Sequence, residues 1–378
     1  MKAIRLRTEY LKDPLGIDIT SPRLFWNCEG GIAQTAYQIV AVVDGATAWD
    51  SGKVASPQMA RIPCPVEAVS RRRVTWKVRL WDENDLAGEW SESAFFEWGL
   101  LKPADWQAKW ITGNYRVDKQ RRYPVDCFRH SFSMANQVKR ARLYITACGL
   151  YEAKLNGAKV GNFCLAPGIT DYRKRIQYQT YDVTEMLTEG TNELTLQLAD
   201  GWYRGSTGAW GHTNQYGTET KLLAQLEIVY ADGSTDIVVS DNAWQWSNDG
   251  PIRFADNKDG EIVEASRIPS YCGKAKVTVC PVTPTASNNV PVTEHETFHP
   301  TITTAPNGKR LLDFGQNLAG YVSFRLHAHE GQRMVWRFGE MLDADGNLTL
   351  KNIQCSNKKV TTPLQKIEYT CIDRKSVV

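Results

Sequence analysis

The stretch Val74-Thr75-Trp76-Lys77-Val78-Arg79-Leu80-Trp81 decides the fold class of this chain. Apolar side chains occupy every second position from Val74 to Leu80, so one face of an extended segment is apolar and the other polar, as in a β-strand that borders a core. The same alternation recurs at residues 37–42, 141–145, 194–198 and 222–228, with turn residues between the segments. We therefore predict an all-β protein.

Helix signals are scarce. The best one, at residues 183–187, is followed by Glu189 and Gly190 and predicts one or two turns. No period of 20 to 50 residues repeats, which argues against a propeller or a solenoid. A domain built from long paired helices is therefore not expected within these residues.

Composition excludes several classes of protein. The chain has 378 residues, enough for two or three domains of roughly 150 residues each. Its 42% hydrophobic content rules out a disordered chain. Lys and Arg (45) exceed Asp and Glu (42) by only three charges, too few to predict a nucleic-acid or membrane partner. The first residues lack the apolar segment of a signal peptide, so we predict a protein that is cytoplasmic, or one from which such a segment has been trimmed.

Cysteine and aromatic residues carry further information. Nine scattered cysteines without a CxxC pair predict reduced thiols rather than a zinc site or a disulfide framework. The chain also holds 13 Trp, 15 Tyr and 11 Phe. Such a content is common in sugar-binding proteins, but tryptophan also packs well in β-sandwich cores, so both interpretations stay open.

Two linker-like segments divide the chain. Residues 101–105 close a first strand-rich block, and residues 281–291, rich in Pro, Thr, Ser and Asn, precede a last one. We predict a first unit at residues 1–101, a second at 105–300 and a third at 301–378. The third has fewer than 80 residues and no obvious closing strand, so we expect an incomplete sandwich.

Several strings, in order along the chain, resemble those of bacterial α-L-rhamnosidases of glycoside hydrolase family 78. One of these strings is Ala199-Asp200-Gly201-Trp202-Tyr203-Arg204-Gly205. The others are residues 21–26, 49–54, 76–83 and 90–92 in the first unit, 166–175 and 178–184 in the second, and 313–321 and 339–342 in the third. The resemblance implies tandem β-sandwiches: a fibronectin-III-like domain of the immunoglobulin type, a jelly-roll or galactose-binding-like domain, and a partial third sandwich.

The same resemblance sets an expectation for catalysis. Family members are expected to continue beyond the third unit into a helical (α/α) barrel that hydrolyses terminal α-L-rhamnosides with inversion. Inverting glycosidases need an acid and a base carboxyl roughly 6.5 to 9.5 Å apart. The family places both carboxyl groups in the barrel, which would be the partner of these domains within the parent polypeptide. No residue here is therefore assigned a catalytic role, and the chain alone is predicted to be inactive.

The resemblance also implies a sugar site in the second unit, where some relatives bind terminal L-rhamnose through calcium. Such a site needs oxygen ligands for a hard cation and an apolar face for the sugar. The candidate sugar contacts are Asp171, Tyr172, Asp200, Trp202, Tyr203, Trp210 and Asn214. The candidate calcium ligands among them are Asp171, Asp200 and Asn214. Alternatively, Asp171 caps a turn, Asp200 begins a tight bend and Trp202 belongs to the core.

Two acidic clusters look like cation loops. The segment from Asp343 to Asn347 does not fit an EF-hand, because Leu348 and Gln354 stand where glycine and glutamate are required, and a hairpin turn explains it better. For residues 256–261 we favour a turn over a weak cation site.

Three functional hypotheses remain. The chain supplies the accessory β-sandwich modules of an α-L-rhamnosidase, or it is a stand-alone calcium-dependent L-rhamnose-binding module without hydrolysis, or it is a purely structural β-sandwich scaffold. The last would expose apolar surface and self-associate.

Overall fold

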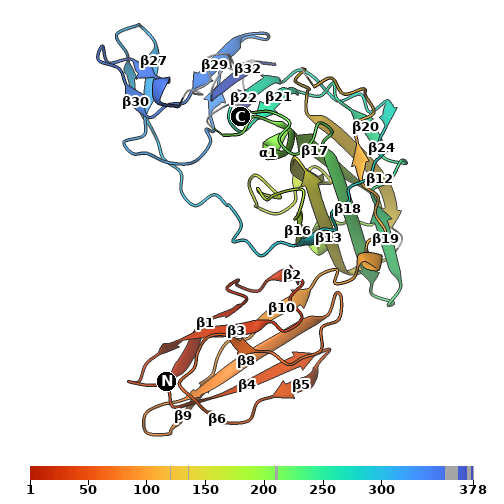
Figure 1. Ribbon diagram of the computed structural model, residues 1–378, viewed down its shortest axis with the longest axis vertical. Coiled ribbons are helices and arrows are strands. Elements are labelled where there is room, and N and C mark those ends of the chain that lie inside the picture. The colour runs from red at the N-terminus through yellow and green to blue at the C-terminus, as the bar shows by residue number, and fades with distance from the viewer. Residues whose placement is uncertain (120, 135, 209–211, 354–364, 373–375, 378) are drawn as a thin grey trace.

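The computed structural model describes residues 1–119, 121–134, 136–208, 212–353, 365–372 and 376–377 (Figure 1). Its regular structure is almost entirely β, which confirms the predicted fold class. The described helices are α1 (Gly201–Arg204) and the 3₁₀ turns η1 (Pro103–Asp105), η2 (Thr184–Met186) and η3 (Lys351–Ile353). The short helix expected at residues 183–187 is thus η2. None of the described helices is long and apolar enough to span a membrane.

The first unit is a sandwich of two sheets. One sheet has the order β1 (Lys2–Thr8), β3 (Arg23–Glu29) and β7 (Ile62–Pro63). The other has the order β2 (Leu15–Ile17), β10 (Ala94–Trp98), β8 (Arg73–Trp81), β4 (Ala36–Val43) and β5 (Ala46–Asp50), with β6 (Val54–Ala55) on β4 and β9 (Ala87–Trp90) on β8. Val74, Trp76, Val78 and Leu80 are all buried, as the alternation predicts. Their side chains pack with Trp26 and Trp98 in one core.

The second unit also has two sheets, which enclose the largest apolar core. One has the order β24 (Lys276–Val277), β11 (Ile111–Thr112), β18 (Lys221–Tyr230), β13 (Val138–Cys148), β16 (Gln177–Asp182) and β25 (Thr285–Ala286), with β19 (Thr235–Val239) on β18. The other has the order β15 (Ala158–Lys159), β14 (Leu150–Leu155), β17 (Gly190–Ala199), β12 (Asp126–Met134), β20 (Gln245–Ser247) and β23 (Gly273–Lys274). Antiparallel neighbours dominate both sheets, as in a jelly roll.

The third unit contains smaller sheets. A four-stranded sheet has the order β21 (Ile252–Asp256), β22 (Gly260–Glu264), β32 (Lys366–Thr370) and β29 (Arg333–Arg337). Three two-stranded pairs are β26 (Thr301–Thr304) with β27 (Arg310–Asp313), β28 (Arg325–Leu326) with β33 (Ser376–Val377), and β30 (Met341–Leu342) with β31 (Leu348–Thr349). The last pair confirms the hairpin predicted around Asp343.

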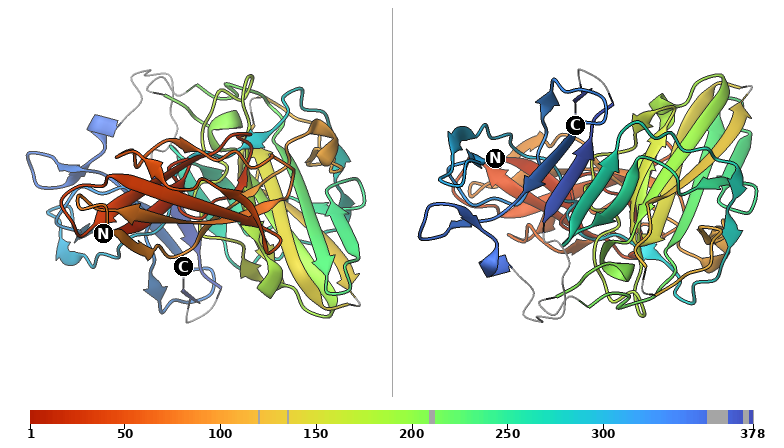
Figure 2. Two further views of the ribbon diagram at one scale, coloured as in Figure 1. Left: turned by 90° about the horizontal axis from the view of Figure 1, so that it is seen from below. Right: turned by 90° about the horizontal axis from the view of Figure 1, so that it is seen from above.

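The β21–β22 hairpin links the second and third units. It lies within the second unit by sequence, yet β22 pairs in parallel with β32 from Gly260↔Lys366 to Glu264↔Thr370. Figure 2 shows the hairpin beside the strands of the third unit. The loop from Asp256 to Gly260 is the turn of this hairpin. The predicted unit boundaries stay predictions. The sheet that β22 and β32 share crosses the predicted boundary at residue 300.

The first unit is docked on the second through buried polar contacts. Arg142 on β13 donates from Nε and Nη2 to the two carboxylate oxygens of Glu97 on β10, at 2.7 and 3.0 Å. The Tyr178 hydroxyl on β16 accepts from the backbone N–H of Leu100 at 2.9 Å. Gly99 allows this approach, because a Cβ there would lie 2.2 Å from that hydroxyl oxygen. The two sandwiches therefore meet through a specific, closely fitted contact.

Candidate functional site

The predicted sugar-binding string forms a bend and a single helical turn after β17. Gly201 has a φ of +52°, in the left-handed region, and a Cβ at this position would lie 2.6 Å from Cγ of Leu150. Glycine is therefore the residue that this bend requires. The turn that follows is α1, which buries Tyr203 and Arg204 and leaves Trp202 half-buried.

Asp200 and Arg204 form a buried ion pair across α1. The guanidinium of Arg204 donates from Nε to Asp200 Oδ1 at 2.7 Å and from Nη1 to the Tyr115 hydroxyl at 2.8 Å. Burial raises the pKa of Asp200, and the Arg204 charge opposes this rise. This pair lies inside the fold, so Asp200 has a structural role in addition to the sugar and calcium contacts predicted for it.

A second buried carboxylate lies on the same network. Asp126 accepts hydrogen bonds from Trp246 Nε1 at 2.9 Å and from the Tyr115 and Thr220 hydroxyls at 3.3 and 3.4 Å. It is fully buried, and desolvation raises its pKa to about 6 despite the opposing charge of Arg204. The pKa of this carboxyl group thus lies well above that of an ordinary aspartate.

Arg122 holds the tip of the β21–β22 hairpin against the loop that follows α1. Its Nη1 donates to Asp256 Oδ2 at 3.1 Å, and its Nη2 donates to Asp259 Oδ2 and Ser206 Oγ at 2.9 and 2.7 Å. Ser206 also donates its backbone N–H to Asp256 Oδ2 at 2.7 Å. Arg122 Nη1 lies 4.0 Å from Asp200 Oδ2. The hairpin that reaches the third unit is thus anchored beside α1.

Aromatic residues surround the other side of α1. Tyr172 is buried and packs edge-on against Tyr203 and Tyr216, with ring centroids 5.4 and 5.1 Å away. Its hydroxyl donates to the Gly168 carbonyl at 2.8 Å, and burial raises its pKa. Tyr172 and Tyr203 therefore belong to a small core cluster, which holds the turn in place.

A cavity of about 490 Å³ opens at α1, between the second and third units. Its lining combines the Trp202 ring with polar groups, among them Lys258 on the hairpin turn. The full lining is Leu165, Trp202, Ser206, Thr207, Gly208, Asn257, Lys258, Gly320 and Gln365. Volumes of roughly 300 to 1,000 Å³ are typical of small-ligand sites.

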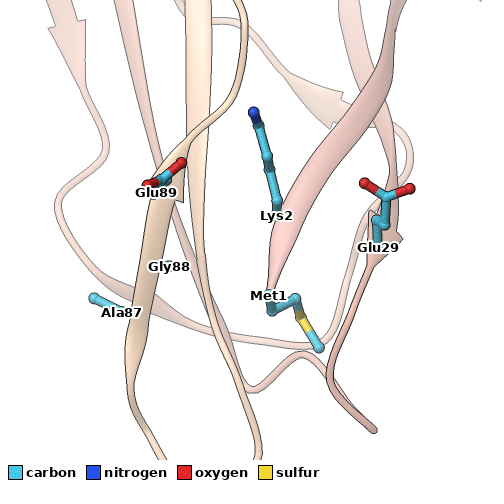
Figure 3. A pocket seen from close by; sticks show the side chains of 6 residues that line it. All are labelled: Met1, Lys2, Glu29, Ala87, Gly88 and Glu89. Atoms are coloured by element: carbon cyan, nitrogen blue, oxygen red, sulfur yellow. The ribbon is translucent and has the colours of Figure 1, made fainter.

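A second cavity, of about 430 Å³, lies at the end of the first unit that is far from the second. Figure 3 shows Lys2 and the carboxylates of Glu29 and Glu89 around it, together with Met1. It contains no aromatic side chain. A sugar site would need such an apolar face, so the cavity at Trp202 is the better candidate.

The structure brings most of the predicted site residues to one region. Asp200, Trp202 and Tyr203 lie on or next to α1, with Tyr172 against Tyr203. The loop with Asn214 adjoins the helix, because its backbone N–H donates to the Arg204 carbonyl at 2.9 Å. Of all these residues, only Trp202 lines the cavity. Trp210 lies outside the described residues.

The predicted calcium ligands have other partners. Asp171 Oδ1 accepts from Nε of Arg173 at 2.9 Å, which lowers the pKa of Asp171. Asp200 pairs with Arg204. The described part of the chain contains no group of three or more His, Cys, Asp or Glu side chains that could hold a metal. These residues do not form a ready cation site, so calcium binding stays a prediction.

Sequence reasoning missed the residues that organise the site. Arg122 meets Asp256 and Asp259 across 134 and 137 positions of the sequence. No local motif marks such a pairing, although the string around Asp256 was noticed as an acidic cluster. Tyr115 and Asp126 carried no sequence signal at all.

Comparisons with known proteins match all three units. Residues 3–102 match the family described as the Rha78A-like N-terminal immunoglobulin domain. Residues 136–303 match the α-L-rhamnosidase N-terminal domain, and residues 303–372 match the bacterial α-L-rhamnosidase concanavalin-like domain. The fold and these matches define a tandem array of β-sandwich domains of the types named in these family models.

Individual relatives agree with these matches. The α-L-rhamnosidases of Alteromonas sp. (strain LOR) and Formosa agariphila are each 33% identical, over 87% and 91% of this chain. The native α-L-rhamnosidase structure from Aspergillus terreus is 29% identical in sequence and has a TM-score of 0.90. The match covers all of this chain and 45% of the Aspergillus terreus chain. The chain belongs to the bacterial α-L-rhamnosidase family, glycoside hydrolase family 78, and comprises its N-terminal domains. It spans 39% and 40% of the two curated relatives' length.

Proposed function

We propose that this chain provides the accessory β-sandwich domains of an enzyme that hydrolyses terminal α-L-rhamnosides with inversion, and that its second unit binds terminal L-rhamnose. The cavity at Trp202 carries the binding part of the proposal. A half-buried indole gives an apolar face for the methyl group and ring carbons of the sugar, while Ser206, Asn257 and Lys258 supply polar groups for its hydroxyls.

The accessory role rests on the family membership and on the content of the fold. The described residues contain one four-residue α-helix and three 3₁₀ turns, so they include no helical barrel. Several of their most buried carboxylates, including Glu97, Asp200 and Asp256, are paired with arginine. These pairs give the carboxylates partners within the fold, so each has a structural role. The catalytic barrel is the partner that we propose for the outer surfaces of these domains.

Calorimetric titration with L-rhamnose tests the binding part. We expect millimolar affinity, because one monosaccharide offers few atoms for contact. Trp202→Ala removes the apolar face and should abolish the heat. Trp49→Ala is the matched control, because it removes a partly buried tryptophan from β5 in the first unit. No heat from the folded wild-type chain would contradict the sugar site.

The same titration after chelation tests the role of calcium. Heat that disappears on chelation and returns with added calcium would support calcium-dependent binding and would make Asp171, Asp200 and Asn214 the next residues to substitute. Heat that is unchanged by chelation would leave a sugar site that uses only side chains of the chain.

A structural scaffold is the second candidate, and one observation favours it. Large apolar side chains of the third unit are solvent-exposed, including Ile302 (58%), Tyr321 (64%) and Met341 (55%). Exposed apolar surface of this kind promotes association. Concentration-dependent self-association in sedimentation velocity, together with no heat from L-rhamnose, would support the scaffold over the sugar-binding module.

The cysteines bear on the compartment. The cysteines within the described residues, a set that does not include Cys355, form no disulfides. This supports a reducing compartment for the protein, in line with the cytoplasmic location predicted from the sequence. Thiol counting in freshly lysed producing cells tests it, and nine reactive thiols per unfolded chain are expected.

A further inference from the structure

An alternating row of cations and aromatic rings lies on the outer face of the seven-stranded sheet of the first unit. Arg79 lies between two indoles, with its Cζ 5.0 Å from the Trp81 centroid and 4.9 Å from the Trp90 centroid. Lys53 lies 5.0 Å from the Trp81 ring, and Lys77 lies 4.8 Å from the Trp90 ring. We call these five residues the ladder. Its members come from β8, β9 and the segment between β5 and β6.

The cations of the ladder lie outside the apolar core. The side chains of Lys77 and Arg79 point away from it, because they alternate with the buried Val78 and Leu80 on β8. Arg79 donates from Nη2 to Gln38 at 2.6 Å, and its Nε has no hydrogen-bond partner among the described residues. The row of cations is thus held mainly by rings, a contact that preserves their charge.

The face carries unbalanced positive charge. Lys53 pairs with Asp85, and Asp50 reaches Arg79 through Gln38. Lys77 has no ion pair within the described part of the chain, and Arg73, further along β8, lies over the Phe95 ring at 3.6 Å. Residues two apart on a strand are about 7 Å apart, so Lys77 and Arg79 are about 7 Å apart, and Arg73 lies about 14 Å from Lys77 on the same face of β8.

We propose that the ladder face of the first unit binds an acidic polysaccharide, one that carries carboxylate or sulfate groups. A row of cations matches an extended chain with regularly repeated anions. The rings restrict the rotamers of Lys77 and Arg79, so less side-chain entropy is lost when an anion binds. This inference goes beyond the proposed rhamnose site, because it concerns another unit and another chemistry.

The arrangement favours a polysaccharide over a nucleic acid. Proteins that bind single-stranded DNA or RNA offer free aromatic faces on which bases stack. In the ladder, Trp90 is covered by Arg79 and Lys77, and Trp81 by Arg79 and Lys53. The net charge of +3 is also low for a nucleic-acid-binding protein. What the face offers is charge at fixed positions, which suits the anions of a glycan chain.

Fluorescence anisotropy with labelled polygalacturonate oligomers and labelled dextran sulfate, at low salt, tests the proposal on the full chain. We expect the wild type to bind at least one of them. Lys77→Glu should weaken this binding at least about fivefold, because it removes one charge contact and adds a repulsion. Lys77→Arg, which keeps the charge, should bind as the wild type does. Lys12→Glu, the same charge change at an exposed loop lysine outside the ladder, should have less than a twofold effect.

Three results would overturn the proposal. The first is that the folded wild type binds neither polymer at low salt. The second is that Lys12→Glu weakens binding as much as Lys77→Glu does. The third is that single-stranded DNA competes as well as the polysaccharides at equal charge. Circular dichroism of each variant confirms that it is folded. The L-rhamnose titration is independent of this assay, so either proposal can fail alone.

Discussion

The first and third units are both joined to the second, but by different kinds of contact. The first meets it through side chains of two completed sandwiches, including the buried Arg142–Glu97 pair. The third meets it through backbone pairing, because β22 shares a sheet with β32 and β29. In Figure 1 the second unit therefore lies between the other two.

The cores differ in the same way. The buried cluster of the first unit includes Trp26, Trp76, Trp98 and Phe96, whereas that of the third consists of Ala328, Tyr369 and Cys371. Hydrophobic stabilisation grows with the apolar area removed from water. Each of the first two units thus encloses a large apolar core of its own, whereas the main sheet of the third includes a hairpin that belongs to the second unit by sequence.

The largest expected effect comes from breaking the contact between the first two units. Glu97→Ala removes the carboxylate that accepts two hydrogen bonds from the buried Arg142 guanidinium, and leaves this charge with its contact from Nη1 to Asp182 at 2.9 Å. We expect a loss of about 3 to 5 kcal/mol in the free energy of unfolding, measured by urea denaturation of these units. Replacing Glu97 and Arg142 together by methionine should cost much less. An equal cost for the single and double variants would contradict the role of the pair.

A smaller effect is expected from the buried carboxyl beside α1. The pKa of Asp126 is raised to about 6 by burial, while an unfolded aspartate has a pKa of about 3.9. Between these values the folded state binds more protons, so this group lowers stability as pH rises from 4 to 6. The change amounts to about 2 to 3 kcal/mol.

Asp126→Asn removes this titration and keeps an oxygen acceptor for Trp246 Nε1. Urea denaturation at several pH values should show the variant gaining stability relative to the wild type from pH 4 to pH 6. Parallel stability curves for the two proteins would show that Asp126 keeps an ordinary pKa.

The smallest effect is expected in the third unit. Met334 on β29 is only partly buried against the small cluster around Tyr369. We expect Met334→Ala to cost about 1 kcal/mol or less, whereas Leu226→Ala in the core of the second unit should cost about 2 to 5 kcal/mol. Hydrogen exchange should be faster at β32 than at β8 or β13 in the wild type. Comparable protection of all three strands would contradict the contrast.

The sequence predicted more of the fold than of the candidate site. The alternation from Val74 to Leu80 follows from local geometry, so it predicted both the strand and its buried face. The string from Ala199 to Gly205 pointed to a tight bend, which the structure has at Gly201, while the sugar-binding role of Trp202 stays a prediction. The ion pairs of Arg122 with Asp256 and Asp259 depend on how distant loops meet, which no local pattern encodes. The shared sheet of β22 and β32 is likewise a long-range pairing.

We propose that these domains serve an α-L-rhamnosidase without carrying its chemistry. The most direct measurement is the release of the aryl group from an aryl α-L-rhamnoside by the purified, folded 378-residue chain. We predict no release above the rate of a buffer control at any pH between 4 and 8. Turnover that follows protein concentration and persists through repeated purification would contradict the account and place a catalytic pair within these sandwiches.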